Sequence, residues 1–326
     1  MWREEGVLVR VPASTANLGP GFDTLGMALK LHIWVSMKPA EQLSIRLHGT
    51  QLVGIPTDER NLIYKMALHV FKEAGIEPKP LEIDVYSDIP LTRGLGSSAS
   101  AIIAGMVAAN ALIGNQISVE RLYEMSTRIE QHPDNVGASL LGGIVVATWD
   151  GMKVNYVRLA PHKHLGVVVA IPRFYLETKE ARNVLPNEVS MADAVYNISR
   201  SSLLVAALCT GQFERLADAM RDRIHQPYRA PLIPGMARIL EEAPMYGALG
   251  VALSGAGPTL LALIDKREDD EYLREYLSKT LHIHGVDADV VRLEPSNEGA
   301  VCSGTAADFQ AVLDRAQAYT EGAKRI

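Results

Sequence analysis

A short glycine-rich stretch between a strand-like and a helix-like segment constrains the fold of this chain more than any other feature. It reads Pro90-Leu91-Thr92-Arg93-Gly94-Leu95-Gly96-Ser97-Ser98-Ala99-Ser100. Apolar and polar residues alternate over residues 81–86, which is the period of a half-buried strand, and the apolar run over residues 101–109 is typical of a buried helix. The stretch is therefore predicted to lead from a strand into the N-terminus of a helix.

This stretch has the residue types that suit an anion. Gly94 and Gly96 allow a tight backbone turn, and Ser97 and Ser98 place hydroxyls beside the unpaired N–H groups of the first helical turn. A helix N-terminus carries about half a positive charge and attracts anions, phosphates above all. The simplest alternative is a Gly-Ser loop before an N-capped helix. The common P-loop does not fit, because no lysine follows Gly96.

Length and composition indicate an ordinary globular protein. The 326 residues suggest about two domains, and 48% hydrophobic with 21% charged residues argues against disorder. The net charge of −6 disfavours a general nucleic-acid or acidic-membrane binder. No apolar run approaches the roughly 18–20 residues of a membrane span, and the N-terminus lacks the apolar core of a signal peptide. Because Cys209 and Cys302 make no disulfide framework or zinc spacing, we expect a cytoplasmic protein with free thiols.

Two polar loops could bind a small ligand. The first follows a predicted strand over residues 7–11 and contains Asn17 and Asp23 around a Gly-Pro-Gly turn. In turns, such side chains more often bond their own backbone. The second loop is His132-Pro133-Asp134-Asn135, where the proline ends a predicted helix. A histidine at such a helix end is more often a cap or a core residue than a catalyst.

Four other polar residues have ordinary explanations when taken alone. Asn61 can cap a helix predicted over residues 61–74. Glu124 lies at the edge of the apolar stripe of its helix, where a glutamate is usually solvated. Arg182 and Arg229 would be surface residues, although each guanidinium offers a planar fork that matches a carboxylate.

Taken together and in order, these motifs resemble those of the GHMP kinases, and among them the homoserine kinases. The resemblance rests on Pro-x-x-x-Gly-Leu-Gly-Ser-Ser-Ala, Asn-Leu-Gly-Pro-Gly-Phe-Asp, His-Pro-Asp-Asn, the Thr-Lys-Glu-Ala-Arg and Pro-Tyr-Arg contexts of the two arginines, and Ser-Gly-Ala-Gly-Pro-Thr. It implies an α+β, two-domain GHMP kinase fold. An N-terminal nucleotide-binding domain over residues 1–155 would contain a left-handed β-α-β crossover, and residues 156–326 would form a ferredoxin-like C-terminal domain.

The same resemblance implies an activity. The expected reaction is ATP-dependent phosphorylation of the side-chain hydroxyl of L-homoserine to O-phospho-L-homoserine, a step of threonine biosynthesis, aided by Mg²⁺. Phosphoryl transfer has a loose transition state, so positioning and charge neutralisation would carry most of the catalysis. Homoserine would be the partner, with no nucleic acid or membrane involved. The sequence leaves the oligomeric state open, a homodimer being one option.

The resemblance also implies roles for single residues. Mg²⁺ would be held by Ser98 and Glu124, with Glu130 next in line, and Gly255, Gly257 and Thr259 would support the glycine loop. Substrate contacts are implied for Asn17, Asp23, His132, Asp134, Asn135, Arg182 and Arg229. ATP contacts are implied for Asn61, Pro90, Leu91, Thr92, Arg93, Gly94, Leu95, Gly96, Ser97, Ser98, Ala99 and Ser100.

A general base is not expected. Several GHMP relatives have an aspartate as base at the position which, counted from Glu124, is Asn135 here, and an amide cannot take a proton. Asp23 is then at most an orienting acceptor. Two other functions stay open: a GHMP kinase for another acceptor, such as mevalonate or shikimate, and a non-enzymatic sensor that keeps the fold without turnover.

Overall fold

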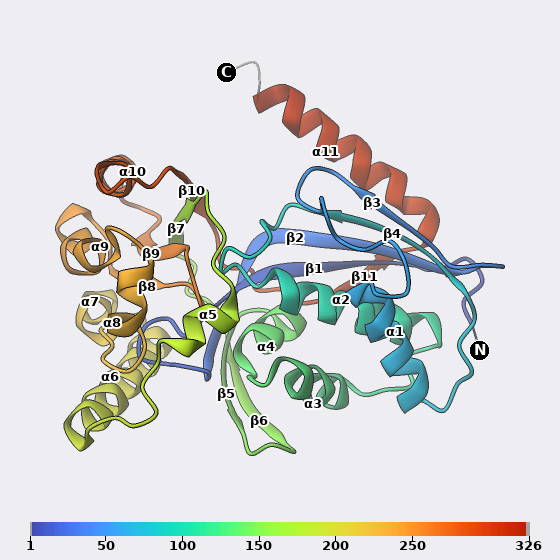
Figure 1. Ribbon diagram of the computed structural model, residues 1–326, viewed down its shortest axis with the longest axis horizontal. Coiled ribbons are helices and arrows are strands. Elements are labelled where there is room, and N and C mark those ends of the chain that lie inside the picture. The colour runs from blue at the N-terminus through green and yellow to red at the C-terminus, as the bar shows by residue number, and fades with distance from the viewer. Residues whose placement is uncertain (1, 324–326) are drawn as a thin grey trace.

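A seven-stranded sheet forms one half of the molecule (Figure 1). The computed structural model describes residues 2–323. The strands of this sheet are β1 (Val7–Ala16), β2 (Leu25–Pro39), β3 (Ser44–His48), β4 (Leu81–Ser87), β5 (Ile144–Trp149), β6 (Val154–Leu159) and β11 (Val301–Gly304). Five of them lie in the order β11-β1-β2-β4-β3, while β5 pairs with β2 and β6 pairs with β5.

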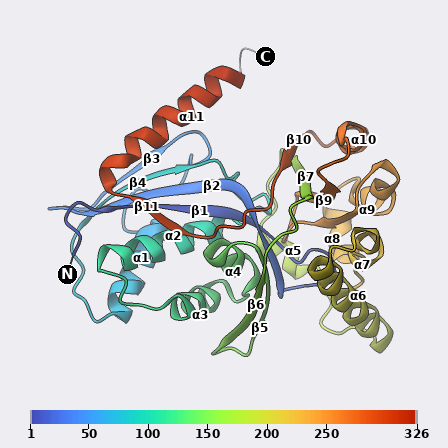
Figure 2. The same cartoon turned by 180° about the vertical axis from the view of Figure 1, so that it is seen from behind.

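Helices cover the two faces of this sheet unequally. One face is covered by α1 (Leu62–Glu73), α2 (Ser97–Leu112), α3 (Val119–Glu130) and α4 (Asp134–Leu141). The other face carries η4 (Ala306–Asp308) and α11 (Phe309–Ala323), as the view from behind shows (Figure 2). Helix α1 joins the parallel neighbours β3 and β4, which gives the β-α-β unit expected of this half.

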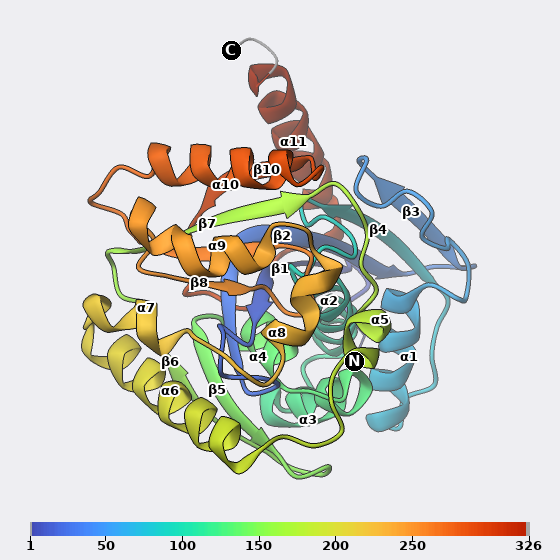
Figure 3. The same ribbon diagram turned by 60° about the vertical axis from the view of Figure 1, so that its left-hand side comes forward.

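The second sheet is ferredoxin-like, as predicted. Its strands β7 (Leu165–Pro172), β8 (Gly250–Leu253), β9 (Leu260–Asp265) and β10 (Ala288–Leu293) are antiparallel in the order β10-β7-β9-β8 (Figure 3). Helix α10 (Glu271–Ile283) connects β9 to β10. Between β7 and β8 the chain forms α5 (Thr178–Asn183), α6 (Met191–Thr210), η1 (Phe213–Arg215), α7 (Leu216–Ala219), α8 (Gln226–Arg229), η2 (Ala230–Leu232), α9 (Met236–Glu242) and η3 (Ala243–Tyr246).

Three features differ from the sequence-based expectation. The boundary expected after residue 155 falls inside β6, and β11 returns to the first sheet by pairing with β1. The sequence also predicts a helix over residues 213–224, but the helix ends at Ala219, and the chain turns before α8 begins at Gln226. None of the helices within residues 2–323 is long and apolar enough to cross a membrane.

Strand β7 joins the two halves into one packed unit. All eight of its residues are buried, since successive side chains point to opposite faces and both faces are covered. Val167 and Val169 pack in the core that includes the first sheet, whereas Val168 and Ala170 pack in the core beneath α9 and α10. Loops from both halves therefore meet at fixed positions.

Candidate active site

One pocket lies at this junction and gathers most of the predicted site residues. Its walls come from the β1–β2 loop, the glycine loop, the α3–α4 turn, α5, α8 and the β8–β9 loop. The predicted residues that line it are Asn17, Asp23, Thr92, Gly94, Gly96, Ser97, Ser98, Ala99, His132, Asp134, Asn135, Arg182, Arg229, Gly255 and Gly257. It is also lined by Glu130, which sequence reasoning ranked second, and by Ala16, Leu176, Thr178 and Ala256, which it did not single out.

The glycine loop is held closely by its surroundings. Gly94 and Gly96 have φ of 75° and 69°, a conformation that glycine adopts without strain. A Cβ at Gly94 would overlap the backbone of Ser254, and one at Gly96 would overlap Ser14. The Ser254 hydroxyl donates a 2.5 Å hydrogen bond to the Gly94 carbonyl. Ser254 and Gly257 thus pack against the glycine loop, and the support implied for Gly255, Gly257 and Thr259 stays a prediction.

Some residues of the glycine stretch do not reach the pocket. Pro90, Leu91 and Arg93 are half-buried outside its lining, and the Arg93 guanidinium lies 5.3 Å from the ring centre of Tyr175. The other two residues, Leu95 and Ser100, are fully buried. The Ser100 hydroxyl donates to backbone carbonyls, including that of Gly96. Ser100 thus helps to hold the loop in shape, and the ATP contacts implied for these five residues stay a prediction.

Asn61 acts as a helix cap and lies outside the pocket lining. Its side-chain oxygen accepts from the N–H of Ile63 at 2.9 Å and of Tyr64 at 3.4 Å. Its amide nitrogen donates to the Pro56 carbonyl at 2.7 Å, and the residue is 1% exposed. Both ends of the amide are occupied, so the geometry argues against the implied ATP contact.

We expect Asn61→Ala to lower the free energy of unfolding by about 1–2 kcal/mol while leaving the KM for ATP unchanged, because it removes a buried cap. Denaturant unfolding and steady-state kinetics measure the two quantities. Asn61→Ser, which keeps a cap acceptor, should recover most of the stability. A higher KM for ATP at unchanged stability would return Asn61 to the nucleotide site.

The pairing of Ser98 with Glu124 is wrong, because Glu130 takes that place. The Ser98 hydroxyl donates to Glu130 Oε1 at 2.6 Å, and both residues line the pocket. Glu124 instead accepts from Arg121 at 3.2 Å, outside the pocket lining. Helix α3 meets the glycine loop with its last residue, and Glu124 lies six residues earlier, about 9 Å back along the axis.

Ser98 and Glu130 fit a divalent cation. A hydroxyl and a carboxylate are the hard oxygen ligands that Mg²⁺ prefers, usually together with substrate phosphates. Ser98 lies in the first turn of α2 and Glu130, the last residue of α3, lies beside it. The dipole of α2 favours phosphates at this end of the helix. The 2.6 Å contact between Ser98 and Glu130 also shows that both oxygens can reach one point.

The β1–β2 loop carries Asp23 into the pocket in a constrained conformation. Asn17, Leu18 and Asp23 have φ of 72°, 48° and 55°, which non-glycine residues rarely adopt and which often marks a functional site. The Asn17 amide fixes this loop by accepting from the Asp23 N–H and donating to the Gly255 carbonyl, each at 3.0 Å. Asn17 therefore lines the pocket mainly as a support.

Arg182 of α5 forms a two-pronged ion pair with Asp23. Its Nη1 and Nη2 donate to the two carboxylate oxygens at 3.0 Å and 2.7 Å. Burial alone would lower the pKa of Arg182, but the hydrogen bond to Asp23 and the negative charges of Asp23, Asp134 and Glu130 together raise it. Both carboxylate oxygens of Asp23 are thus engaged by a cation.

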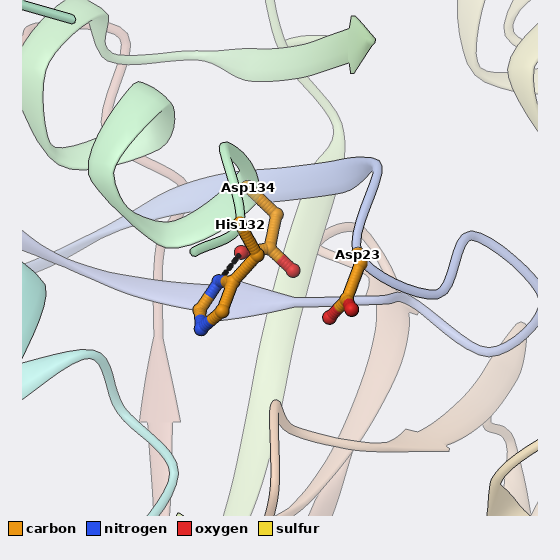
Figure 4. Close-up of side chains that lie close together, drawn as sticks. All are labelled: Asp23, His132 and Asp134. Atoms are coloured by element: carbon orange, nitrogen blue, oxygen red, sulfur yellow. Dashed lines mark hydrogen bonds and ion pairs between the residues drawn. The ribbon is translucent and has the colours of Figure 1, made fainter. Parts of the chain in front are cut away.

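A histidine between carboxylates forms another wall, and Figure 4 shows it beside Asp23. His132 Nδ1 lies 2.5 Å from Asp134 Oδ1, and its Nε2 lies 3.6 Å from Glu130 Oε2. Burial would lower the pKa of His132, but the negative charges of Asp134, Asp23 and Glu130 prevail and raise it to about 8. At neutral pH the imidazole is protonated and donates to Asp134.

Arg229 is the most unusual cation of the site. It is 1% exposed, yet no carboxylate within residues 2–323 pairs with it. Its Nε donates to the Ala181 carbonyl at 3.0 Å, and its Nη1 donates to the Gly255 carbonyl at 3.1 Å and contacts His225 Nδ1 at 3.2 Å. Burial and then repulsion from Arg182 lower the pKa of Arg229 to about 10, so it stays charged at neutral pH. A buried cation without an anion indicates an anionic ligand.

Comparison with known proteins agrees with this geometry. Residues 61–143 match the GHMP kinases N terminal domain, and residues 204–283 match the GHMP kinases C terminal region. The homoserine kinase of Deinococcus radiodurans is 45% identical over 90% of this chain and 95% of its own, and that of Carboxydothermus hydrogenoformans is 43% identical over 90% and 96%. The crystal structure of homoserine kinase from Cytophaga hutchinsonii superposes with a TM-score of 0.82, at 29% identity, over 92% of this chain and 98% of that one.

The two-sheet fold and its glycine loop are those of a GHMP kinase, as predicted. GHMP kinases act on different acceptors, and the three relatives named above are all homoserine kinases. The chain belongs to the homoserine kinase family.

Proposed function

We propose that this protein transfers the γ-phosphoryl group of ATP to the side-chain hydroxyl of L-homoserine. The observation that carries the proposal is the unpaired, buried guanidinium of Arg229 in the same pocket as the glycine loop. One end of the pocket suits phosphates and the other suits a carboxylate. An acceptor with a carboxylate would supply the anion that Arg229 lacks. The relatives of this chain are named for homoserine, which carries a carboxylate.

At the nucleotide end, the backbone N–H groups of the glycine loop and the start of α2 would hold the phosphates. Mg²⁺, held by Ser98 and Glu130, would supply charge neutralisation. Because the transition state of phosphoryl transfer is loose, these fixed positive groups supply most of the catalytic effect.

At the acceptor end, Arg229 would bind the carboxylate of homoserine, with Arg182 adding a second guanidinium. The carboxylates of Asp23 and Asp134 suit the ammonium group, and Asn135 offers an amide for the hydroxyl. The Asn135 amide nitrogen already donates to the Ser14 hydroxyl at 3.1 Å, which leaves its oxygen for the substrate.

Neither His132 nor Asp23 is well suited to act as a general base. His132 already carries its proton at neutral pH, and both oxygens of Asp23 are engaged by Arg182. Direct transfer guided by positioning is therefore the mechanism we propose.

We expect Asp23→Asn to raise the KM for homoserine and to lower kcat moderately, because the change weakens positioning and frees Arg182. Loss of a true base would instead remove roughly 10²–10⁴-fold from turnover at saturating homoserine. The pH dependence of kcat in both proteins measures the difference. A fall in kcat beyond about 10³-fold, with the acid limb of the profile abolished, would identify Asp23 as the base.

A coupled assay of ADP release tests the function. With ATP, Mg²⁺ and single acceptors, we expect turnover with L-homoserine and little with mevalonate or shikimate, which lack the ammonium group. Turnover that is highest with another acceptor would make the chain a GHMP kinase of different specificity. Nucleotide and homoserine binding without ADP release would favour the sensor, although Ser98 and Glu130 argue for an active enzyme.

The cellular context forms part of the same proposal. O-phospho-L-homoserine would enter threonine biosynthesis, and the need for ATP agrees with a cytoplasmic location. Cys209 and Cys302 are both free and exposed, which suits a reducing compartment.

We further propose that the protein forms a homodimer through α6, which lies at the outer edge of the molecule in Figure 3. Burying an unpaired charge is costly when two proteins associate. Packing this face of α6 against the same face of a second copy would bury no such charge. We expect wild type to be a dimer and Ile198→Glu a monomer in light scattering; a monomeric wild type would refute this. No exposed residue of α6, a helix the structure describes in full, is charged: Met191, Ala192, Val195, Ile198, Ser199, Ser202, Leu203, Ala206, Cys209 and Thr210.

A further inference from the structure

A buried histidine stands one helical turn before Arg229. The His225 side chain is 0% exposed, its Nε2 lies 2.7 Å from the Gly19 carbonyl, and its Nδ1 lies 3.2 Å from Arg229 Nη1. A carbonyl oxygen only accepts and a guanidinium only donates. Nε2 must therefore carry the proton and Nδ1 must accept, so these two contacts select one neutral tautomer.

The charges around His225 agree with a neutral ring. Burial lowers the pKa of His225, and the positive charge of Arg229 acts in the same direction. The carboxylates of Asp222, 3.7 Å from Nε2, and of Asp23 oppose this without reversing it. A proton on Nδ1 would place two donors face to face, so the neutral form is the one that can hold Arg229.

Asp222 fixes the backbone that carries His225. Its fully buried carboxylate accepts from the N–H groups of Ile224, His225 and Gln226 at 3.0, 2.9 and 2.6 Å. It also accepts from the Asn197 amide of α6 at 2.6 Å. These bonds explain why residues 220–225 leave the helix, and they leave the ring of His225 little freedom.

His225 also contacts the loop that carries Asp23. Gly19 belongs to that loop, and the ring of Phe22 stacks on His225 with centroids 5.1 Å apart. The guanidiniums of Arg182 and Arg229 lie 5.5 Å and 5.3 Å from the ring centre of Phe22. One histidine thus links the β1–β2 loop to the cation that we assign to the carboxylate.

We propose that His225 is a positioning residue for the acceptor: its Nδ1 accepts from Arg229 and orients that fork toward the substrate carboxylate. The proposal rests on the proposed function, since it concerns the carboxylate of the same acceptor. The proposed role of His225 concerns the acceptor end of the pocket and not the nucleotide end. His225 should therefore affect homoserine and leave ATP largely unaffected.

Three substitutions separate the two contacts of the ring. Asn at position 225 can place its amide oxygen near Nδ1 and still accept from Arg229, whereas Gln can place its amide nitrogen near Nε2 and serve only Gly19. Phe keeps the contact with Phe22 and loses both hydrogen bonds. We expect His225→Gln and His225→Phe to raise the KM for homoserine about tenfold or more, His225→Asn to stay within about threefold, and the KM for ATP to change little in all three.

An acceptor without a carboxylate gives a second readout. For 3-aminopropan-1-ol, which is homoserine lacking that group, His225→Gln and wild type should have similar kcat/KM. A purely structural role would lower kcat/KM for both acceptors and raise the KM for ATP. That result, or a His225→Asn variant as impaired as His225→Gln, would overturn the proposal.

The outcome for the proposed function is separate. If wild type does not turn over homoserine, the proposed function fails whatever the variants do. If wild type does turn it over and His225→Gln keeps the wild-type KM, only the role of His225 is refuted. Should His225→Phe fail to fold, the Asn and Gln pair still decides, with thermal unfolding recorded for both.

Discussion

Replacing Glu130 with Gln is expected to lower turnover at least about a hundredfold at saturating ATP and homoserine, or about 3 kcal/mol in the barrier. The substitution keeps the shape of the side chain and its contact with Ser98, but it removes the negative charge that Mg²⁺ prefers in a ligand. The assay is ADP release at increasing Mg²⁺ concentration, which should also show a higher Mg²⁺ requirement.

Glu124→Gln is the matched control, because the same chemical change falls on the same helix, six residues away. Glu124 is half-buried and pairs with the partly exposed Arg121 outside the pocket lining, so we expect near-normal turnover. If instead Glu124→Gln is inactive and Glu130→Gln retains turnover, the oxygen ligands of the metal come from a rearranged α3, and our assignment is wrong.

The choice between these glutamates shows where sequence reasoning stops. The apolar pattern of α3 fixes which side chains face the core, but it does not say which end of the helix meets the glycine loop. That depends on where the helix ends, and Glu130 is its last residue, with the left-handed Gln131 as its cap. The short connection to His132 then brings Glu130 to Ser98.

The two arginines of the site show the same limit of reasoning from sequence. Two arginines far apart in sequence could be linked to a carboxylate only through resemblance to a family. In the structure Arg182 pairs with Asp23, whereas Arg229 is buried and unpaired. This difference depends on how α5 and α8 pack against the β1–β2 loop. The i, i+4 spacing of His225 and Arg229 is visible in the sequence, but its meaning is not, because Gly19 and Asp222 supply the other contacts.

Local patterns were sufficient where neighbouring residues decide the structure. The glycines before Ser97 predicted the turn into α2, and the alternation of apolar residues predicted β4 and the strand that corresponds to β1. Strands β10 and β11 were not predicted. Both are short and contain no buried residue, and β11 depends on pairing with β1, which lies almost three hundred residues earlier.

Replacing Arg229 with Met is expected to weaken homoserine binding by about 30-fold or more, since losing one partner of a desolvated carboxylate–arginine contact costs about 2–5 kcal/mol. Methionine fills a similar volume without charge, but it leaves His225 Nδ1 and the Ala181 carbonyl without the Arg229 donor, while the Gly255 carbonyl keeps only the Asn17 amide. Arg182→Met should cost less, because Arg182 is partly exposed and already neutralised by Asp23.

The measurements are calorimetric titrations of homoserine and, separately, of a non-hydrolysable ATP analogue. Arg229→Lys keeps the charge without the fork and should bind homoserine with an affinity between wild type and Arg229→Met. Thermal unfolding of each variant separates loss of binding from loss of the fold. If ATP-analogue affinity falls as much as homoserine affinity in a folded Arg229→Met protein, Arg229 serves the nucleotide or the junction of the two sheets, and the carboxylate must bind elsewhere.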